Sequence, residues 1–365
     1  MEKSNLLTPS EVTYIIVGSI LGLNVLSLPA SVTKIANNDG WIGVILGSIY
    51  PLYIIFCSFF IFKNKKNINI IQVGQKYLGK TIGNILGIIF SIQFLLNSIL
   101  ITARLGDMLR TYVIVFLKQN KLVFPIILVT IYAASKGIKA LGEINQIIFF
   151  ISLPLIFILA FSIKDGNILN IKPMFSSGFM NILKCGLKAA DSFSGMEVIL
   201  LIVPLMNDKN TIKKCFLKGT LIIIAIYLWF TFMCIYYLGP DICSKLRWPV
   251  LSVIENIHLH GLLNFKYIFM FLWINIIFKA ISNHAFFLNY SLSSVFEKLN
   301  SKLVFIVTFI IMNIVVNLSS DTPIVKKFIN KLSIIYVIFN IIYITIILCV
   351  VLLKKEDKNE KINTI

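Results

Sequence analysis

The segment at residues 178–206, GFMNILKCGLKAADSFSGMEVILLIVPLM, is apolar enough to enter a membrane but is interrupted halfway by the polar stretch at residues 191–195. Glu197 follows two residues later. Charged and small polar groups are costly at membrane depth, and they persist mainly where the backbone unwinds around a cavity enclosed by protein. The pattern therefore predicts a membrane helix that is broken at its centre.

A similar interruption lies in the first apolar span, where Gly22 and Asn24 are followed by Pro29. Gly22 lets the backbone bend without a side-chain clash, and amides freed by the bend are able to hold a carboxylate. The alternative is that Gly22 and Asn24 only let helices pack closely. Paired breaks in matching positions are typical of secondary transporters with a solute site between them, which favours the site.

The composition indicates a protein that lies almost wholly in the membrane. The chain is 58% hydrophobic and its mean hydropathy is +0.88, far above the values of a soluble domain. Apolar runs long enough to cross a bilayer recur along it. We expect an all-α polytopic membrane protein with ten transmembrane helices, at residues 12–36, 41–62, 82–108, 122–135, 144–163, 179–206, 216–238, 265–296, 303–318 and 332–353.

The breaks fall in spans one and six, so the spacing predicts an inverted five-plus-five repeat. One transmembrane domain would cover residues 1–353, with repeats at about 10–165 and 175–353, and residues 354–365 would form a charged cytoplasmic tail. The outer connection at 239–264 carries apolar residues that suit an amphipathic helix around 248–257. Lysines are somewhat more frequent in the connections on the side of the termini, which favours both termini in the cytoplasm.

Other classes of function lack support. The net charge of +18 comes from lysines spread over short loops, which fits anionic lipid headgroups and not a nucleic-acid-binding face. The six cysteines form no CxxC pair, and the sequence has no metal-ligand spacing. The sequence contains no nucleophile–base set and no phosphate-binding loop, so nothing in it indicates an enzyme or a cofactor.

Several polar groups lie inside the spans. Asn97 is near the middle of the third and is able to bond a ligand or another helix. Arg104 and Asp107 are three residues apart near its end, and we expect them to pair structurally. Lys188 and Asp191 are also three apart, and we interpret them as an ion pair on an interfacial face.

Glu197 and Lys279 are candidates for charge coupling. Glu197 would lie in the first turn after the second break, where it either balances a solute ammonium, carries a proton or is tied to backbone amides. Lys279 lies well inside the eighth span, so it must face a cavity or a carboxylate, or lose its proton. We expect the two to be coupled, directly or through water.

The motifs resemble those of one family. LGLNVLSLP at residues 21–29 resembles its first-helix motif, DGWI at 39–42 the entry to its second helix, and SFSGMEVI at 192–199 its sixth-helix signature; Gly142-Glu143 and Trp248-Pro249 also fit. Together with the ten spans they resemble the spore germination permeases, the B subunits of GerA-type germinant receptors, in the amino acid–polyamine–organocation superfamily.

The resemblance implies a germinant-sensing subunit of the spore inner membrane that binds a small nutrient, often an amino acid, and acts with an A subunit and a lipoprotein C subunit. The alternative is an independent amino-acid/proton symporter. In the superfamily, helices one, three, six and eight surround the solute, which implies a pocket bounded by Gly22, Asn24, Phe94, Asn97, Ser194, Met196, Asn275 and Ser282.

Overall fold

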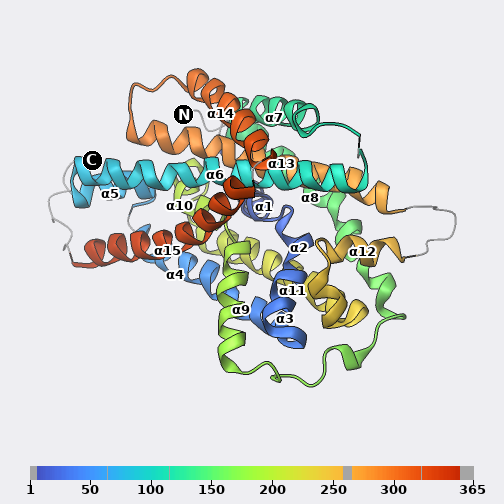
Figure 1. The fold of residues 1–365 in the computed structure, drawn as a ribbon. Coiled ribbons are helices and arrows are strands. Elements are labelled where there is room, and N and C mark those ends of the chain that lie inside the picture. The colour runs from blue at the N-terminus through green and yellow to red at the C-terminus, as the bar shows by residue number, and fades with distance from the viewer. Residues whose placement is uncertain (1–5, 64, 115, 258–264, 322, 354–365) are drawn as a thin grey trace.

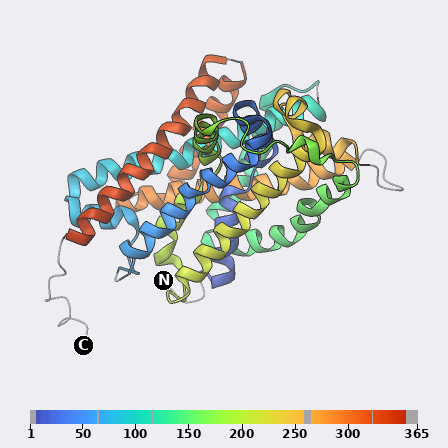
Figure 2. The ribbon, with the colours of Figure 1, turned by 90° about the horizontal axis from the view of Figure 1, so that it is seen from below.

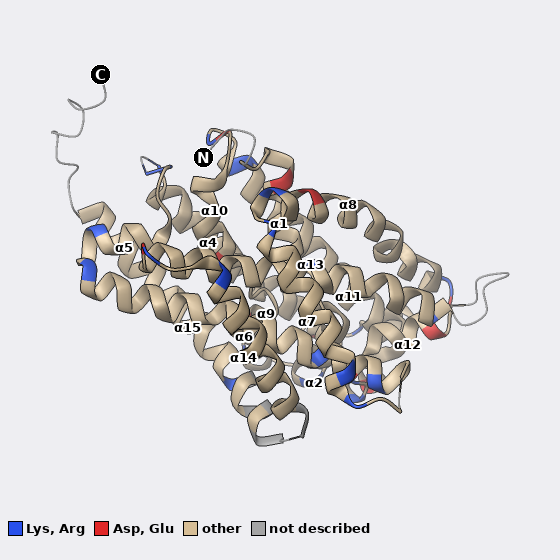
Figure 3. Ribbon diagram, turned by 90° about the horizontal axis from the view of Figure 1, so that it is seen from above, with Lys and Arg blue, Asp and Glu red and all other residues tan. Residues whose placement is uncertain are grey.

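A computed structural model describes residues 6–63, 65–114, 116–257, 265–321 and 323–353 (Figure 1). The predicted tail at 354–365 lies outside the described residues. Among the described residues, seven helical stretches are long and apolar enough to cross a membrane. Lys and Arg gather at helix ends and connections and leave the helix bodies largely uncharged, as lipid contact requires (Figure 3).

Helices account for every predicted span. The α-helices are α1 (Pro9–Ile20), α2 (Asn24–Ala36), α3 (Gly40–Gly47), α4 (Ile49–Ile61), α5 (Ile70–Leu78), α6 (Lys80–Tyr112), α7 (Gln119–Ser135), α8 (Ile138–Phe157), α9 (Phe179–Ser192), α10 (Ile199–Ile202), α11 (Ile212–Lys245), α12 (Pro249–Glu255), α13 (Phe265–Val295), α14 (Ser301–Asp321) and α15 (Pro323–Leu353). Short 3₁₀ helices are η2 (Asn37–Asp39), η3 (Ile158–Ile163), η4 (Ile168–Asn170), η5 (Met196–Val198) and η6 (Val203–Leu205).

Two of the spans are broken as predicted. The first divides into α1 and α2, which are separated by Leu21, Gly22 and Leu23. The sixth divides into α9 and the segment from η5 to η6, and the chain between them passes through Gly195 at φ +108°. Gly195 adopts this left-handed conformation at little cost because it has no Cβ atom.

Local sequence signals determine where α1 and α12 begin. Thr8 caps α1, since its side chain accepts a hydrogen bond from the Glu11 amide while the Glu11 carboxylate accepts one from the Thr8 amide. Pro249 occupies the first turn of α12, where a missing N–H costs nothing. The apolar face of α12 is buried against the bundle, so the predicted amphipathic helix is present and packs on protein.

The long helices are arranged around the broken ones. Helix α6 packs along α13, and α15 runs beside α4 and α6 (Figures 1 and 2). Helices α3 and α9 approach each other very closely through small residues, because a Cβ atom at Gly43 would lie 2.0 Å from Cys185 Sγ. Close approach of this kind increases van der Waals contact, which drives helix association in lipid.

This contact generates a test of the fold. A Cβ atom at Gly47 would lie 2.7 Å from Ala189 Cβ and 2.9 Å from Ala190 N. We expect Gly47→Val to force α3 away from α9 and to lower the free energy of unfolding by about 1–3 kcal/mol, as overpacking does. Thermal unfolding of the purified protein in detergent measures this loss. Ile49→Phe is the matched control, since Ile49 is 60% exposed toward lipid, and an equal loss in both variants would contradict the packing.

Candidate functional site

The two helix breaks face each other in the centre of the bundle. A Cβ atom at Gly195 would lie only 2.4 Å from the carbonyl oxygen of Ser19, in the last turn of α1. The hydroxyl of Tyr227 on α11 lies 3.0 Å from the carbonyl oxygens of both Ile20 and Ser192, and its proton can be donated to either. One buried side chain thus links the end of α1 to the end of α9.

Helix α13 satisfies further carbonyl groups of the first break. Trp273 donates from its indole Nε1 to the carbonyl oxygen of Gly22 at 3.3 Å. His284 donates from Nε2 to the carbonyl oxygen of Ser19 at 3.0 Å. Both side chains are fully buried, so these bonds replace the water that an unwound backbone would otherwise need.

A small cavity of about 20 Å³ lies between the breaks. It has room for about one water molecule and is far smaller than the pockets that enclose solutes. Four of the predicted residues line it, namely Gly22, Asn24, Asn97 and Ser194. The structure therefore brings four of the eight predicted residues together around one small cavity.

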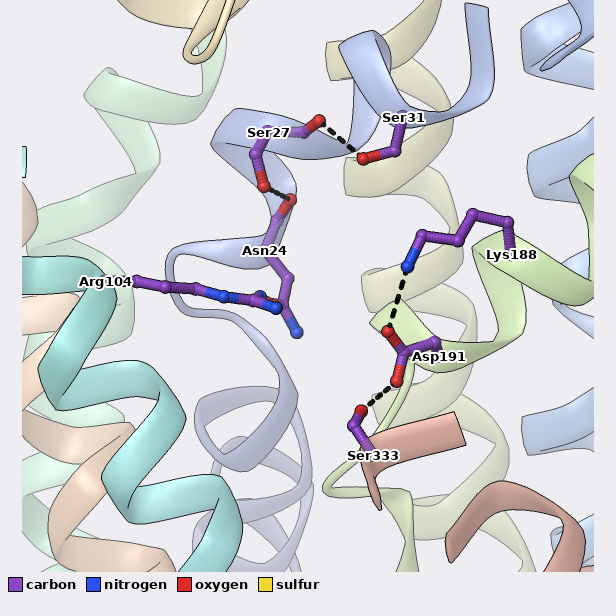
Figure 4. Close-up of polar contacts among 7 residues, drawn as sticks. All are labelled: Asn24, Ser27, Ser31, Arg104, Lys188, Asp191 and Ser333. Carbon is purple, nitrogen blue, oxygen red and sulfur yellow. Dashed lines mark hydrogen bonds and ion pairs between the residues drawn. The ribbon is translucent and has the colours of Figure 1, made fainter. Parts of the chain in front are cut away.

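Hydrogen bonds connect the residues around this cavity. The Asn97 amide donates to the Ser194 hydroxyl at 3.0 Å, which joins α6 to the second break. The guanidinium of Arg104 donates to the side-chain oxygen of Asn24, which joins α6 to the first break (Figure 4). Asn24 begins α2, whose preceding residue supplies no side-chain cap, so that helix end directs amide groups at the same region.

Charges of both signs reach the cavity wall, as Arg104 and Asp191 both line it. Asp191 accepts a hydrogen bond from the hydroxyl of Ser333 on α15 and lies 3.5 Å from the ammonium of Lys188 (Figure 4). The predicted Lys188–Asp191 ion pair is confirmed, but its carboxylate faces the site and not the membrane interface. A group with a positive and a negative charge would find complementary partners here.

The expected structural pair of Arg104 and Asp107 stays a prediction, and each of the two residues has a further partner on another segment. The Asp107 carboxylate lies 2.5 Å from Arg247, in the chain that leads into α12, and the Arg104 guanidinium donates to the side chain of Asn24. Three-residue spacing permits a pair on one helix but does not exclude partners from other helices. Arg104 is thus a site residue that sequence spacing alone did not identify.

Four predicted residues do not line the cavity. Phe94 packs against the rings of Phe90, His284 and Phe287, and the Met196 sulfur accepts a bond from Thr220 inside the core. Ser282 donates to the carbonyl oxygen of Phe278 in its own helix, and Asn275 is exposed and bonds back to α13 in the same way.

Glu197 is held by three donors. Its Oε2 accepts from the Gly195 amide at 2.7 Å, and its Oε1 accepts from the Tyr50 hydroxyl and from Asn340 Nδ2 at 3.0 Å. Asn340 also donates to Gln93 at 2.8 Å. The carboxylate therefore ties the second break directly to α4 and α15, and through Asn340 to α6, which matches the alternative of a carboxylate bonded to backbone amides.

Lys279 is fully buried, but the structure does not join it to Glu197. Its ammonium has no hydrogen-bond partner among the described residues, and it lies 5.9 Å from the centre of the Phe149 ring. Its side chain packs beside Gly18, close to the bonded pair Asn145 and Asn283. Coupling of Lys279 to Glu197 through water stays a prediction.

Tyr227, Trp273, His284 and Ser333 take part in the site without having been predicted. Tyr, Trp and Ser are ordinary residues in membrane helices, so composition gave no reason to select Tyr227, Trp273 or Ser333. His284 did carry a signal, because an ionisable side chain inside a membrane span is rare and often marks a functional site. Among the described residues, no group of His, Cys, Asp or Glu is arranged to hold a metal ion.

Two facing broken helices in a membrane bundle whose described elements are helical define a transporter-like protein. Solved transporters share this architecture: a Na⁺-coupled sialic acid symporter in a substrate-bound outward-open state superimposes with a TM-score of 0.67 at 12% identity, covering 89% of this chain and 76% of the symporter. A nucleobase-cation-symport-1 family transporter with bound bromovinylhydantoin gives 0.63 at 12% identity, over 87% and 75% of the two chains. The predicted fold class is confirmed.

The chain belongs to the spore germination protein family, whose sequence model matches residues 6–324. Spore germination protein YndE of Bacillus subtilis (strain 168) is 22% identical over 80% of this chain and 82% of its own length. Spore germination protein B2 of the same strain is 25% identical over 72% of each chain, and GerQB of Bacillus cereus is 23% identical over 75% and 76%. The predicted family is confirmed.

The contact between the breaks predicts a severe effect of one methyl group. Gly195→Ala adds the cost of a left-handed backbone, about 1–2 kcal/mol, and also a clash with the Ser19 carbonyl oxygen. Gly137→Ala is the matched control, since Gly137 has φ +92° but open space around its Cβ position. Thermal unfolding should show a clearly larger loss for Gly195→Ala. Equal losses would mean that the breaks are not in contact.

Proposed function

We propose that the chain is the nutrient-sensing subunit of a germinant receptor, and that it binds an amino acid between its two broken helices. The observation that carries this proposal is the cavity bounded by both breaks, Arg104 and Asp191. A solute carboxylate would bind the Arg104 guanidinium and the amides at the start of α2. A solute ammonium would bind the Asp191 carboxylate, with Asn97 and Ser194 as further hydrogen-bonding partners.

The size of the cavity supports a receptor that changes conformation. At about 20 Å³ the closed cavity cannot hold an amino acid, so binding requires a state in which the breaks have separated. A solute that binds the separated state more tightly shifts the population toward it. Partner subunits that contact only one of the two states would then sense the solute.

The family and the named relatives support the setting of this receptor. In this proposal the chain acts with an A subunit and a lipoprotein C subunit in the spore inner membrane, with both termini on the core side. The basic end of the bundle supports the orientation, since the connection at 62–69 and the one at 206–211 carry lysines at the same end as the N-terminal segment.

The test replaces Gly22. A Cβ atom there would meet nothing closer than 3.9 Å, so Gly22→Ala should be tolerated, whereas Gly22→Leu should fill the cavity. Spores that carry each variant are exposed to a mixture of the proteinogenic amino acids, and germination is measured together with the amount of the chain in the membrane. We expect Gly22→Leu to abolish the response at a normal protein level and Gly22→Ala to retain it.

The amino acid that triggers the wild-type spores then tests the charges. Its N-acetyl derivative and its carboxamide derivative each lack one of the two charges, and neither should trigger germination if Asp191 and Arg104 bind them. A full response of the Gly22→Leu spores, or of wild-type spores to both derivatives, would contradict the proposed site.

The second candidate is an amino-acid/proton symporter, and Lys279 is the observation that favours it. A buried ammonium without a hydrogen-bond partner among the described residues is costly, and such lysines occur where a charge is gained or lost during function. Lys279 packs against α1, the helix that ends at the first break. Proton exchange at Lys279 could therefore accompany movement of α1.

Uptake by the isolated chain distinguishes the two candidates. Proteoliposomes with a proton gradient are given a labelled mixture of amino acids, and we expect no accumulation if the chain is a receptor only. Accumulation that disappears in Lys279→Met would establish the symporter instead.

The same variant should unfold with unchanged or higher stability, because a methionine of similar length leaves no buried charge. A double-mutant cycle of Lys279→Met with Glu197→Gln tests the predicted coupling. Strictly additive changes in the free energy of unfolding would contradict it.

A further inference from the structure

A second and much larger cavity lies at one end of the bundle. It has a volume of about 490 Å³ and opens between the end of α4 and the start of α11. None of its lining residues lines the cavity between the helix breaks. The N-terminal segment lies at the same end, since the Leu7 amide donates to the Leu205 carbonyl oxygen at 2.9 Å and the Leu7 carbonyl accepts from the Asn207 amide.

Four lysines line this cavity, and no aspartate or glutamate does: Lys63, Lys66, Lys209 and Lys213. Two of the ammonium groups bond neutral amides, from Lys66 to Asn210 at 3.2 Å and from Lys209 to Asn67 at 2.5 Å. Within the described part of the chain, none of the four forms an ion pair with a carboxylate. No carboxylate of the described residues therefore compensates the positive charge of this cavity.

The remaining wall is aromatic and continues onto the surface that faces lipid. Phe56 and Phe60 are 56% and 43% exposed, and their ring centres lie 4.9 Å apart on the outer side of α4. The ammonium of Lys213 lies 5.6 Å from the centre of the Phe59 ring. The cavity thus has cationic groups next to an apolar wall. A phospholipid has the complementary arrangement, with an anionic phosphate next to its acyl chains.

We propose that this cavity binds an anionic phospholipid, with its phosphate among the four lysines and an acyl chain along Phe56 and Phe60. Basic cavities between transmembrane helices are suited to anionic headgroups. A free anion would leave the aromatic wall without a partner, and a zwitterionic lipid would bring its own cationic headgroup close to the four lysines. Both features of the cavity are matched only by a lipid with net negative charge.

The location gives the lipid a contact with the moving part of the protein. Lys209 and Asn210 belong to the connection between η6 and α11, which is the chain that leaves the second broken helix. A lipid that bridges this connection to the end of α4 would restrain their relative position. Lipid composition would then bias the state of the cavity between the breaks.

The test measures lipid binding directly, without a germination response. The full-length protein is delipidated in detergent and titrated with phosphatidylglycerol or with phosphatidylcholine of identical acyl chains, and bound lipid is counted by native mass spectrometry. We expect one phosphatidylglycerol to bind about tenfold or more tightly than phosphatidylcholine. The variant K63Q/K66Q/K209Q/K213Q should lose this preference.

A control variant separates the cavity from the general charge of the protein. K80Q/K214Q/K218Q/K298Q removes the same number of charges from lysines that are exposed and do not line the cavity, and it should keep the preference. If the fourfold cavity variant does not fold, K66Q/K209Q takes its place, with an expected loss of about threefold or more.

Three outcomes would overturn the proposal. Equal loss of binding in the control variant would show that only surface charge matters. Equal affinity for the two lipids would show that the headgroup is not recognised. Displacement of phosphatidylglycerol by an equal concentration of inorganic phosphate would mean that the cavity binds a free anion and has no use for acyl chains.

Discussion

Every backbone group that a broken helix releases inside an apolar bundle must find its partner in the protein, because lipid offers none. The two breaks release carbonyl groups at Ser19, Ile20, Gly22 and Ser192, and three side chains from α11 and α13 bond to them. The carboxylate of Glu197 does the same for the Gly195 amide. The broken helices are consequently held by the helices around them, and the arrangement of the bundle follows from this requirement.

The same requirement explains why polar side chains collect at the centre of the protein. Once Tyr50, Gln93 and Asn340 are buried with Glu197, each needs a partner of its own, and the network extends across α4, α6 and α15. Arg104 and Asp191 add charges, which are costly to bury. The cost of burying such charges is offset when a solute of opposite charge binds them. These two charges therefore support the proposed function more strongly than the fold supports it.

The sequence was sufficient to predict the ten helical spans and both breaks. Length and hydropathy determine the spans, and a glycine beside polar residues at mid-span is costly unless the helix unwinds there. Which side chains of a helix are buried was harder to predict. Ile268, Phe271, Asn275 and Lys279 follow one stripe of α13, yet the first three are exposed and Lys279 is buried. Neighbouring helices cover α13 on all sides only in its second half, and no pattern within α13 reveals where that cover begins.

The position of Arg104 could not be predicted for a related reason. A long charged side chain near the end of a span can extend to the membrane surface or turn inward, and the choice depends on what the facing helix offers. Here α2 offers the side chain of Asn24 and an uncapped helix end. The break itself thus creates the partner that draws Arg104 inward, and only the assembled bundle places the two together.

Tyr227 shows how the closed state could be linked to the presence of a solute. Its single hydroxyl proton cannot be donated fully to the carbonyl groups of Ile20 and Ser192 at the same time, although it lies 3.0 Å from each. When α1 and α9 separate, the hydroxyl stays with one carbonyl and the other loses its donor, which is costly for a buried carbonyl group. A solute ammonium has three donors and would satisfy the released carbonyl. Solute binding would then offset a cost that arises only in the open state, and this difference between states is what a receptor or a transporter requires.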